Sequence, residues 1–408
     1  MTTPWLTFIG IGEDGREGLS PLAQRLIDQA SFIMGGVRHL SLIGPVKGEA
    51  KSWPHPFEDG IKEIIARRGQ ETVVIASGDP FLYGVGATLS HHIEAEEMLV
   101  IPAPSAFSLM ASRVGWALQE CAQLTLHGRP LEKIIPHLQP HARLLALSWD
   151  GETPNKLAAL LVERGMGESV LHIGEALGGP REKRHRLVAK DLHAQPQQFD
   201  PLNTIGLEIV ARRDARIVPL ASGLDESWFE HDNQITKREV RAITLSSLQP
   251  HQGALLWDIG AGSGSVSIEW MLCHPANRAI AIEVRPDRAQ RITRNALSFG
   301  LPELMVIEDE APDALKDLPQ PDAIFIGGGG TDSRVIDTAL AALKTGGRLV
   351  VNAVTIETQA DVMKRHVEQG GTLIKIDIAR ADPVGPFHGW RASMPVIQWT
   401  SFVKDHVS

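Results

Sequence analysis

Residues 257–269 combine the end of an apolar run, three glycines at alternate positions and a helical pattern, and they carry the clearest chemical signal in the chain. The apolar run, residues 254–257, predicts a buried strand, and the glycines predict a tight turn before a helix begins. This arrangement lets a backbone approach a nucleotide-like ligand closely. We therefore interpret the stretch as a cofactor loop.

Two details favour S-adenosylmethionine over a dinucleotide at this loop. The spacing is G-x-G-x-G rather than G-x-G-x-x-G, and an aspartate stands just before the first glycine. A second predicted strand, residues 279–284, carries a glutamate about 20 residues after the glycines, where a ribose diol needs a carboxylate acceptor. A glycine-rich loop without a ligand and a dinucleotide loop remain the alternatives. The predicted cofactor-binding residues here are Asp258, Gly260, Ala261, Gly262, Ser263, Gly264 and Glu283.

Length and composition bound the class of protein. The chain has 408 residues, with 43% hydrophobic and 22% charged content, which suits a globular enzyme of two or three domains. No apolar run of about 18 residues and no leader pattern is found, so we expect neither a membrane span nor a secretory signal. Only Cys121 and Cys273 are present, which excludes a disulfide framework and fits a reducing cytoplasm.

The charge pattern bears on possible partners. A net charge of −9 argues against a general nucleic-acid binder. The basic run at residues 181–186 has two interpretations, a solvated face or a patch facing an anionic substrate. The 16 histidines are scattered without an H-E-x-x-H pattern, so no metal site is expected.

The elements of the first half predict two α/β units. Three strands (residues 5–9, 72–76 and 98–101) each lead into a small-residue turn and a helix, the first helix spanning residues 21–30. Such a pattern indicates a parallel sheet with ligand loops at the carboxyl ends of its strands. A second unit contains strands at residues 143–147, 169–173 and 203–210, with a helix beginning at residue 153.

The second half reads as one doubly wound domain. A helix at residues 237–248 precedes the glycine loop, and further strands follow at residues 304–307, 323–326 and 348–354. Two β-rich segments, residues 371–379 and 394–402, close the chain, and a final strand pair after five α/β units is typical of Rossmann-like methyltransferases. Periodicity is lost near residues 212–225, so we expect domains at residues 1–212 and 226–408, joined by a linker at 213–225.

Four motifs of the first half resemble the tetrapyrrole methylases, specifically the branch that methylates C-5 of precorrins. They are residues 9–12, 77–84, 104–106 and 127–129. The sequence Gly-Glu-Asp-Gly at residues 12–15 departs from the Gly-Pro-Gly of many members, which leaves the path of that loop open. The resemblance implies cofactor contacts at Gly10, Gly78, Asp79, Pro80, Ser105 and Ala106, although Gly-Asp-Pro is also a common turn.

Motifs of the second half are similar to the C-15 methyltransferases that also decarboxylate the C-12 acetate. They are residues 235–241, the glycine loop with residues 269–270, and residues 311–315, 321–328 and 346–355. The resemblance adds Thr236 and Ala311 to the cofactor contacts. Thr236 could instead be the N-cap of its helix, with Glu239 as a first-turn acid.

Joined in this order, the halves resemble the fused methyltransferases of cobalamin biosynthesis. The resemblance implies a tetrapyrrole-methylase fold of two α/β subdomains, a Rossmann-like methyltransferase domain, and one S-adenosylmethionine site in each. It also implies methylation of C-5 and C-15 of precorrin-6Y with loss of carbon dioxide from the C-12 acetate, giving precorrin-8X. A homo-oligomer is expected, possibly a tetramer through the C-terminal domain. Alternatives are the cobalt-precorrin reactions of the anaerobic route, a methyltransferase for another small molecule or tRNA, and a nucleotide-binding regulator.

This chemistry requires few catalytic side chains. The meso carbons of a reduced tetrapyrrole are already nucleophilic, so the enzyme mainly places carbon, methyl group and sulfur in line. The substrate carries several carboxylates, which arginines can hold. The candidates for substrate binding are Arg129, Arg184, Arg348 and Arg391, together with Gly328, because residues 327–330 leave room for a planar ring.

Overall fold

The computed structural model describes residues 4–328 and 332–403. The chain divides into two compact units, Met1–Ile217 and Val218–Ser408, here called the N-terminal and C-terminal units. The division falls inside residues 213–225, the stretch expected as a linker. Among the described residues, no helix combines the length and apolarity needed to cross a membrane.

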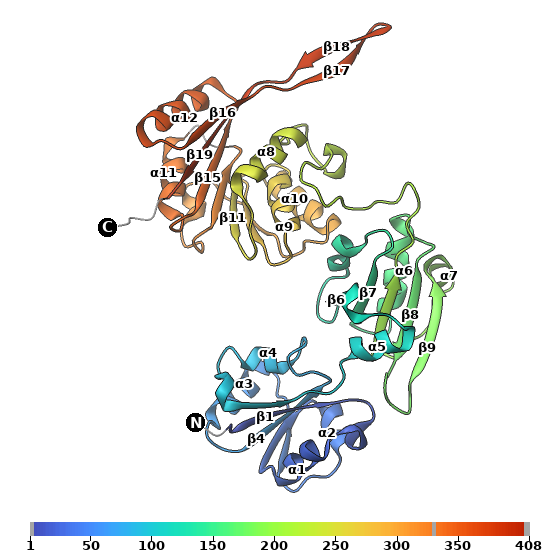
Figure 1. The fold of residues 1–408 in the computed structure, drawn as a ribbon. Helices are drawn as coiled ribbons and strands as arrows, with labels where there is room; N and C mark the ends of the chain where they lie inside the picture. Colours follow the sequence, from blue (N-terminus) through green and yellow to red (C-terminus); the bar gives the residue numbers. More distant parts are fainter. Residues whose placement is uncertain (1–3, 329–331, 404–408) are drawn as a thin grey trace. The chain divides into compact units, whose positions relative to one another are not determined.

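The first sheet of the N-terminal unit is parallel, in the order β3-β2-β4-β1-β5 (Figure 1). Its strands are β1 (Leu6–Ile11), β2 (Phe32–Gly35), β3 (Glu49–Ser52), β4 (Thr72–Ser77) and β5 (Met98–Ile101). Its helices are α1 (Pro21–Gln29), α2 (Val37–Ile43), α3 (Phe57–Ala66) and α4 (Val85–Leu89). Sequence analysis predicted β1, β4, β5 and α1 but missed β2 and β3. Strand β3 is exposed at all four positions, so it has no apolar alternation to detect.

The second sheet of this unit has the order β6-β7-β10-β8-β9. Its strands are β6 (Cys121–Thr125), β7 (Arg143–Leu147), β8 (Val170–Glu175), β9 (Lys183–Val188) and β10 (Asn203–Glu208), with helices α5 (Ala106–Val114), α6 (Thr153–Glu163) and α7 (Ala189–Ala194). Strands β6 and β7 are parallel, and the other pairs are antiparallel. Most of the basic run at residues 181–186 therefore belongs to the edge strand β9. Lysine and arginine on an edge discourage pairing with other chains, which favours the solvated interpretation.

The C-terminal unit is built on a seven-stranded sheet in the order β13-β12-β11-β14-β15-β19-β16. The strands are β11 (Leu255–Ile259), β12 (Arg278–Ile282), β13 (Met305–Ile307), β14 (Ala323–Ile326), β15 (Arg348–Ala353), β16 (Thr372–Ile376) and β19 (Val396–Phe402). Strand β19 runs antiparallel to β15 and β16 on its two sides, and the other pairs are parallel. The strand order reverses between β11 and β14, the position where doubly wound sheets bind ligands.

Helices cover both faces of this sheet. Apolar side chains of α11 (Ser333–Ala342) and α12 (Ile356–Gln369) join the core cluster that contains Trp257 and Trp399. Helices α8 (Arg238–Leu248) and α9 (Ser265–Leu272) contact the opposite face, where Asn352 of β15 donates a hydrogen bond to Thr244 at 2.8 Å. Helix α10 (Pro286–Ser298) follows β12.

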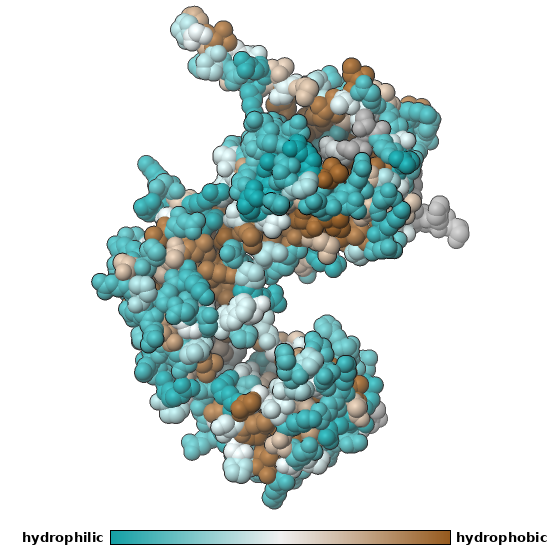
Figure 2. All heavy atoms as spheres, turned by 180° about the vertical axis from the view of Figure 1, so that it is seen from behind, coloured by the Kyte–Doolittle hydropathy of each residue, from teal (hydrophilic) through white to brown (hydrophobic). Residues whose placement is uncertain are grey.

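A two-stranded hairpin extends from the C-terminal unit. Strands β17 (Ala379–Val384) and β18 (Phe387–Ala392) pair with each other and, in the described part of the chain, with no other strand (Figure 1). Apolar side chains are exposed along it (Figure 2), among them Phe387 and Trp390, which are 75% and 80% exposed. Sequence analysis missed this hairpin, because its apolar residues do not face a core.

Candidate functional site

The glycine loop of the C-terminal unit requires three left-handed residues. Gly260, Gly262 and Gly264 have φ values of +71°, +61° and +74°, which glycine adopts without a Cβ penalty. A Cβ on Gly260 would lie 2.7 Å from the Cα of Gly328, so glycine at this position lets the loop approach the end of β14. The structure thus brings together the ends of β11 and β14.

Glu283 lies directly after β12, beside this loop. Its Oε2 accepts a hydrogen bond from the Gly262 amide at 2.8 Å, and its Oε1 accepts one from the Arg285 amide at 3.1 Å. A carboxylate offers about four lone-pair positions, so two remain for the hydroxyls of a bound diol. The carboxylate therefore fixes the loop and can also bind a ribose.

Asp258 supports the loop from within the core. It is 1% exposed, and its Oδ2 accepts hydrogen bonds from the amide and hydroxyl of Ser267 at 3.1 and 2.7 Å. Burial raises the pKa of Asp258 to about 6, and the nearby charge of Glu283 acts in the same direction. These bonds tie Asp258 to α9, and its contact with a cofactor stays a prediction.

Two buried polar atoms at the loop bear on whether a cofactor fits. The Oγ of Ser263 and the Oδ1 of Asp258 have no hydrogen-bond partner within the described residues. Buried polar atoms usually find a partner in the protein, in water or in a ligand. Together with the glycine backbone and the free lone pairs of Glu283, they make the loop suitable for a polar nucleoside-like group.

The segment before α8 runs past the glycine loop. We call residues 230–236 the strap. The carbonyl oxygen of Gln234 lies 3.5 Å from the position that a Cβ on Gly262 would take, and Thr236 ends the segment. Thr236 is not the N-cap of α8: that position is Lys237, which makes no side-chain capping bond. The Thr236 carbonyl instead accepts a hydrogen bond from the buried Arg241.

In the N-terminal unit, three loops meet at the carboxyl ends of β1, β4 and β5. A Cβ on Gly10 would lie 1.8 Å from the carbonyl oxygen of Gly78, and a Cβ on Gly78 would lie 3.0 Å from the Cα of Ser105. The predicted residues Gly10, Gly78 and Ser105 therefore lie close together, with the first residue of α5, Ala106, beside them.

The side chains of these N-terminal loops make local bonds. Asp79 accepts a hydrogen bond from the Phe81 amide at 2.8 Å, and Ser105 caps α5 by accepting one from the Ser108 amide at 3.1 Å. The Pro80 carbonyl accepts the Gly86 amide at 2.9 Å. The polar side chains thus shape the loops, and any ligand contact by Asp79 or Ser105 would add to these bonds.

A polar cluster beside these loops was missed by sequence analysis. His39 and Arg38, at the start of α2, both contact the hydroxyl of Ser77, at 2.7 and 2.8 Å, and Arg38 is paired with Glu13. Burial, with the adjacent Arg38 charge, lowers the pKa of His39 to about 4. The residues come from α2, from the end of β4 and from the turn after β1, so no local spacing could have revealed the cluster.

The arginines predicted to bind substrate are not gathered at the C-terminal glycine loop. Arg348 begins β15, at the opposite end of the sheet from that loop, and its guanidinium lies over the ring of Phe402. Arg391 is on β18 and pairs with Asp382 at 3.1 Å. In the N-terminal unit, Arg184 is on the edge strand β9, 3.7 Å from Glu182, and Arg129 is exposed after β6.

Of the remaining predicted residues, some lie beside the glycine loop and others lie elsewhere or outside the described residues. Gly328 lies against Gly260, as described, whereas Gly329 and Gly330 lie outside the described residues. Ala311 is half-buried and packs against the core cluster of the C-terminal unit. Within the described ranges, no three His, Cys, Asp or Glu side chains form a group that could hold a metal ion.

Comparison with known proteins places both halves of the chain. Residues 5–193 match the family model of the tetrapyrrole (corrin/porphyrin) methylases, and residues 227–403 match that of the precorrin methyltransferase domain. A solved structure titled as the C-terminal domain of precorrin-6Y C5,15-methyltransferase from Rhodobacter capsulatus is 47% identical, covers 45% of this chain and 100% of its own, and has a TM-score of 0.44.

Two curated relatives differ in how much of the chain they match. A cobalt-precorrin-7 C(5)-methyltransferase of Salmonella typhimurium is 33% identical over 46% of this chain and 93% of its own. The precorrin-6Y C(5,15)-methyltransferase (decarboxylating) of a Sinorhizobium species is 54% identical over 98% of this chain and 97% of its own. On that similarity along almost its whole length, the chain belongs to the family of the decarboxylating precorrin-6Y C(5,15)-methyltransferases.

Proposed function

We propose that the chain methylates C-5 and C-15 of precorrin-6Y and decarboxylates its C-12 acetate, giving precorrin-8X, with S-adenosylmethionine as methyl donor at one site in each unit. The observation that carries the proposal is the presence of two differently built glycine loops. One lies at Gly10 and Gly78 and the other at residues 260–264, each at the carboxyl ends of parallel strands. Full-length similarity to enzymes named for both methylations supports the same conclusion.

In the C-terminal unit, the residues would hold the cofactor mainly through backbone. Bound S-adenosylmethionine supplies an electrophilic methyl group. Glu283 would accept hydrogen bonds from the ribose hydroxyls, while the amides and bare Cα atoms of residues 260–264 permit close approach. Gly328 keeps the end of β14 free of a side chain, which leaves space for a flat substrate. Because the acceptor carbon is nucleophilic, holding the reactants in line would supply most of the rate.

We assign C-15 methylation and decarboxylation to the C-terminal unit and C-5 methylation to the N-terminal unit. The assignment follows the resemblance of each half to its branch of methyltransferases, and the matches of residues 5–193 to the tetrapyrrole methylases and of residues 227–403 to the precorrin methyltransferase domain support it. The loops at Gly10, Gly78 and Ser105 would hold the second cofactor molecule.

The direct experiment is mass spectrometry of the product made from precorrin-6Y and S-adenosylmethionine. The product should have gained two methyl groups and lost one molecule of carbon dioxide. A chain that leaves precorrin-6Y unchanged but methylates tRNA or another small molecule would contradict the proposal.

The cobalt-containing substrate of the anaerobic route is the second candidate. It is favoured by the half-length Salmonella relative, which is named for cobalt-precorrin-7. Parallel reactions with cobalt-free and cobalt-containing substrate distinguish the two, and we expect faster turnover of the cobalt-free one.

We further propose that the chain forms a homo-oligomer, a tetramer, through the β17–β18 hairpin. The hairpin exposes Val384, Phe387 and Trp390, which a partner copy would cover. Sedimentation of the intact chain and of Trp390→Glu should show a shift to smaller species in the variant. An unchanged sedimentation coefficient would contradict the role of the hairpin.

A further inference from the structure

We propose that Asn295 is a positioning residue for the methyl transfer of the C-terminal unit, because it fastens the strap to the glycine loop. The inference rests on the proposed cofactor site at that loop. Asn295 lies on α10 and is 2% exposed. The three hydrogen bonds of its side chain all go to backbone groups.

Those bonds join two segments that are far apart in the sequence. The Oδ1 of Asn295 accepts a hydrogen bond from the Glu230 amide at 2.8 Å, and its Nδ2 donates to the Glu230 carbonyl at 3.0 Å. The same Nδ2 donates to the Ser263 carbonyl at 2.9 Å. One amide group therefore fixes the start of the strap in register with the middle of the glycine loop.

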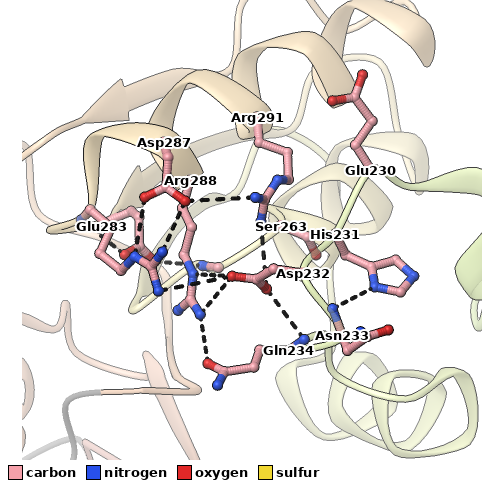
Figure 3. Close-up of polar contacts among 12 residues, drawn as sticks. Glu230, His231, Asp232, Asn233, Gln234, Ser263, Glu283, Asp287, Arg288 and Arg291 are labelled. Carbon is pink, nitrogen blue, oxygen red and sulfur yellow. Dashed lines mark hydrogen bonds and ion pairs between the residues drawn. The ribbon is translucent and has the colours of Figure 1, made fainter.

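Asp232 attaches the strap to α10 at a second point (Figure 3). It accepts hydrogen bonds from Nε of Arg288 at 2.9 Å and from the Gln234 amide at 3.3 Å, and Arg291 lies 3.5 Å away. Although burial opposes ionisation, the hydrogen bonds and the arginine charges lower the pKa of Asp232 to about 2. This fastening therefore stays charged over the whole working range of pH.

The end of the strap is held by a buried ion pair. Arg241 and Glu269 are 0% and 2% exposed in their side chains and lie 2.5 Å apart. Arg241 donates to the Thr236 carbonyl, while Glu269 accepts the amides of Gly223 and Leu224 at 2.7 and 2.9 Å. These contacts fix both ends and the middle of the strap. They hold the carbonyl oxygen of Gln234 at 3.5 Å from the position that a Cβ on Gly262 would take. The strap and the loop thus form one preorganised surface for the cofactor.

The test compares Asn295→Asp with a matched control, Asn277→Asp, both in the full chain. Asn277 is also buried (3% exposed), and it also bonds to two backbone groups, the Gly253 amide at 3.0 Å and the Trp270 carbonyl at 3.2 Å. It lies before β12, at the other end of the sheet from the loop. In Asn295→Asp, an oxygen replaces the amino group and faces two carbonyl oxygens, which should push the strap away.

We expect Asn295→Asp to raise the KM for S-adenosylmethionine in C-15 methylation about tenfold, because two buried donors are lost. The kcat of that reaction should fall less than the KM rises, and C-5 methylation by the same chain should keep its KM. Lower pH should partly restore the KM, since a protonated carboxyl regains one donor. Asn277→Asp should lower the melting temperature of the C-terminal unit and leave both KM values unchanged.

Equal KM changes in Asn295→Asp and Asn277→Asp, or none in either, would overturn the inference. If Asn295→Asp does not fold, Asp232→Asn serves in its place, because Asp232 is partly exposed, with 26% of its side chain accessible. A folded Asp232→Asn with wild-type KM would also overturn it. Failure of the proposed function would be distinguishable, since the unmodified chain would then leave precorrin-6Y without a new methyl group.

Discussion

Glu283 accepts hydrogen bonds from two backbone amides and still has lone pairs for a ligand. We expect Glu283→Ala to weaken S-adenosylmethionine binding in the C-terminal unit by about 1.5–3 kcal/mol, the usual value of hydrogen bonds to a charged group. Titration calorimetry should show two sites in the unmodified chain. In the variant, one of the two sites should bind S-adenosylmethionine more weakly. A single site in the unmodified chain, or unchanged affinities in the variant, would contradict this prediction.

His39 gives the N-terminal unit a sensitivity to acid. Burial, with the charge of Arg38, lowers its pKa from 6.5 to about 4, so the folded unit resists the proton that the unfolded chain accepts. This contribution to stability is present above pH 6.5 and is lost as the pH falls towards 4. In His39→Gln, the melting temperature of the unit should therefore fall less over that range.

The control for His39 is the exposed His91, whose replacement by glutamine should leave the pH dependence of melting unchanged. At each pH, the melting temperature of each variant is compared with that of the unmodified chain. This subtraction is needed because carboxyl groups titrate in all three proteins and change their melting temperatures as well. Parallel curves for His39→Gln and the unmodified chain would contradict the assignment.

At the scale of elements, the glycine loop contains two positions with the same backbone requirement but different surroundings. A Cβ on Gly260 would meet the Gly328 backbone at 2.7 Å, whereas a Cβ on Gly262 has only the Gln234 carbonyl nearby, at 3.5 Å. Both alanine variants carry the cost of a left-handed residue, about 1–2 kcal/mol. Gly260→Ala should therefore destabilise the C-terminal unit markedly, while Gly262→Ala should remain folded and lose affinity for S-adenosylmethionine.

Melting curves and calorimetry on the two variants check this difference. Equal destabilisation by both substitutions would show that the contact with Gly328 does not limit the loop. Full affinity in Gly262→Ala would show that the cofactor does not approach that Cα.

Sequence patterns predicted the elements that follow a regular apolar period and end in glycine. Strands β1, β4 and β11 are buried at nearly every position and lead into turns, so both their type and their loops could be predicted. Strand β3 and the β17–β18 hairpin are largely exposed, and their apolar signal is absent or misleading.

The supporting contacts of the site could not be predicted in the same way. Asn295 bonds to Glu230 and Ser263, which are 65 and 32 residues away, and nothing in the local sequence marks such a bridge. Arg348 lies in one of the motifs that the sequence offered, but it is the first residue of β15 and so lies at the end of the sheet away from the glycine loop. The motifs therefore predicted where the loops lie in the sequence. The contacts between loops could be identified only from the three-dimensional structure.

At the scale of the whole molecule, the chain consists of two compact units, each with its own core and its own glycine loop. The stretch at residues 213–225 contains few regular elements, so we expect limited proteolysis to cut there first. Two stable fragments of roughly equal size should result. Cleavage spread over both units, with no stable fragments, would contradict the expected linker.

Because each unit has its own site, we expect two variants that each lack a different activity to complement each other. Gly10→Ala places a Cβ 1.8 Å from the Gly78 carbonyl oxygen and should abolish C-5 methylation alone. Gly262→Ala should abolish C-15 methylation and carbon dioxide release alone. We expect the tetrapyrrole to leave one chain and enter another, so that a mixture of the two variants converts precorrin-6Y into the fully methylated, decarboxylated product, as mass spectrometry would show. Carbon dioxide release by Gly262→Ala on its own, or a mixture that stays inactive although both variants are folded, would contradict this division of labour.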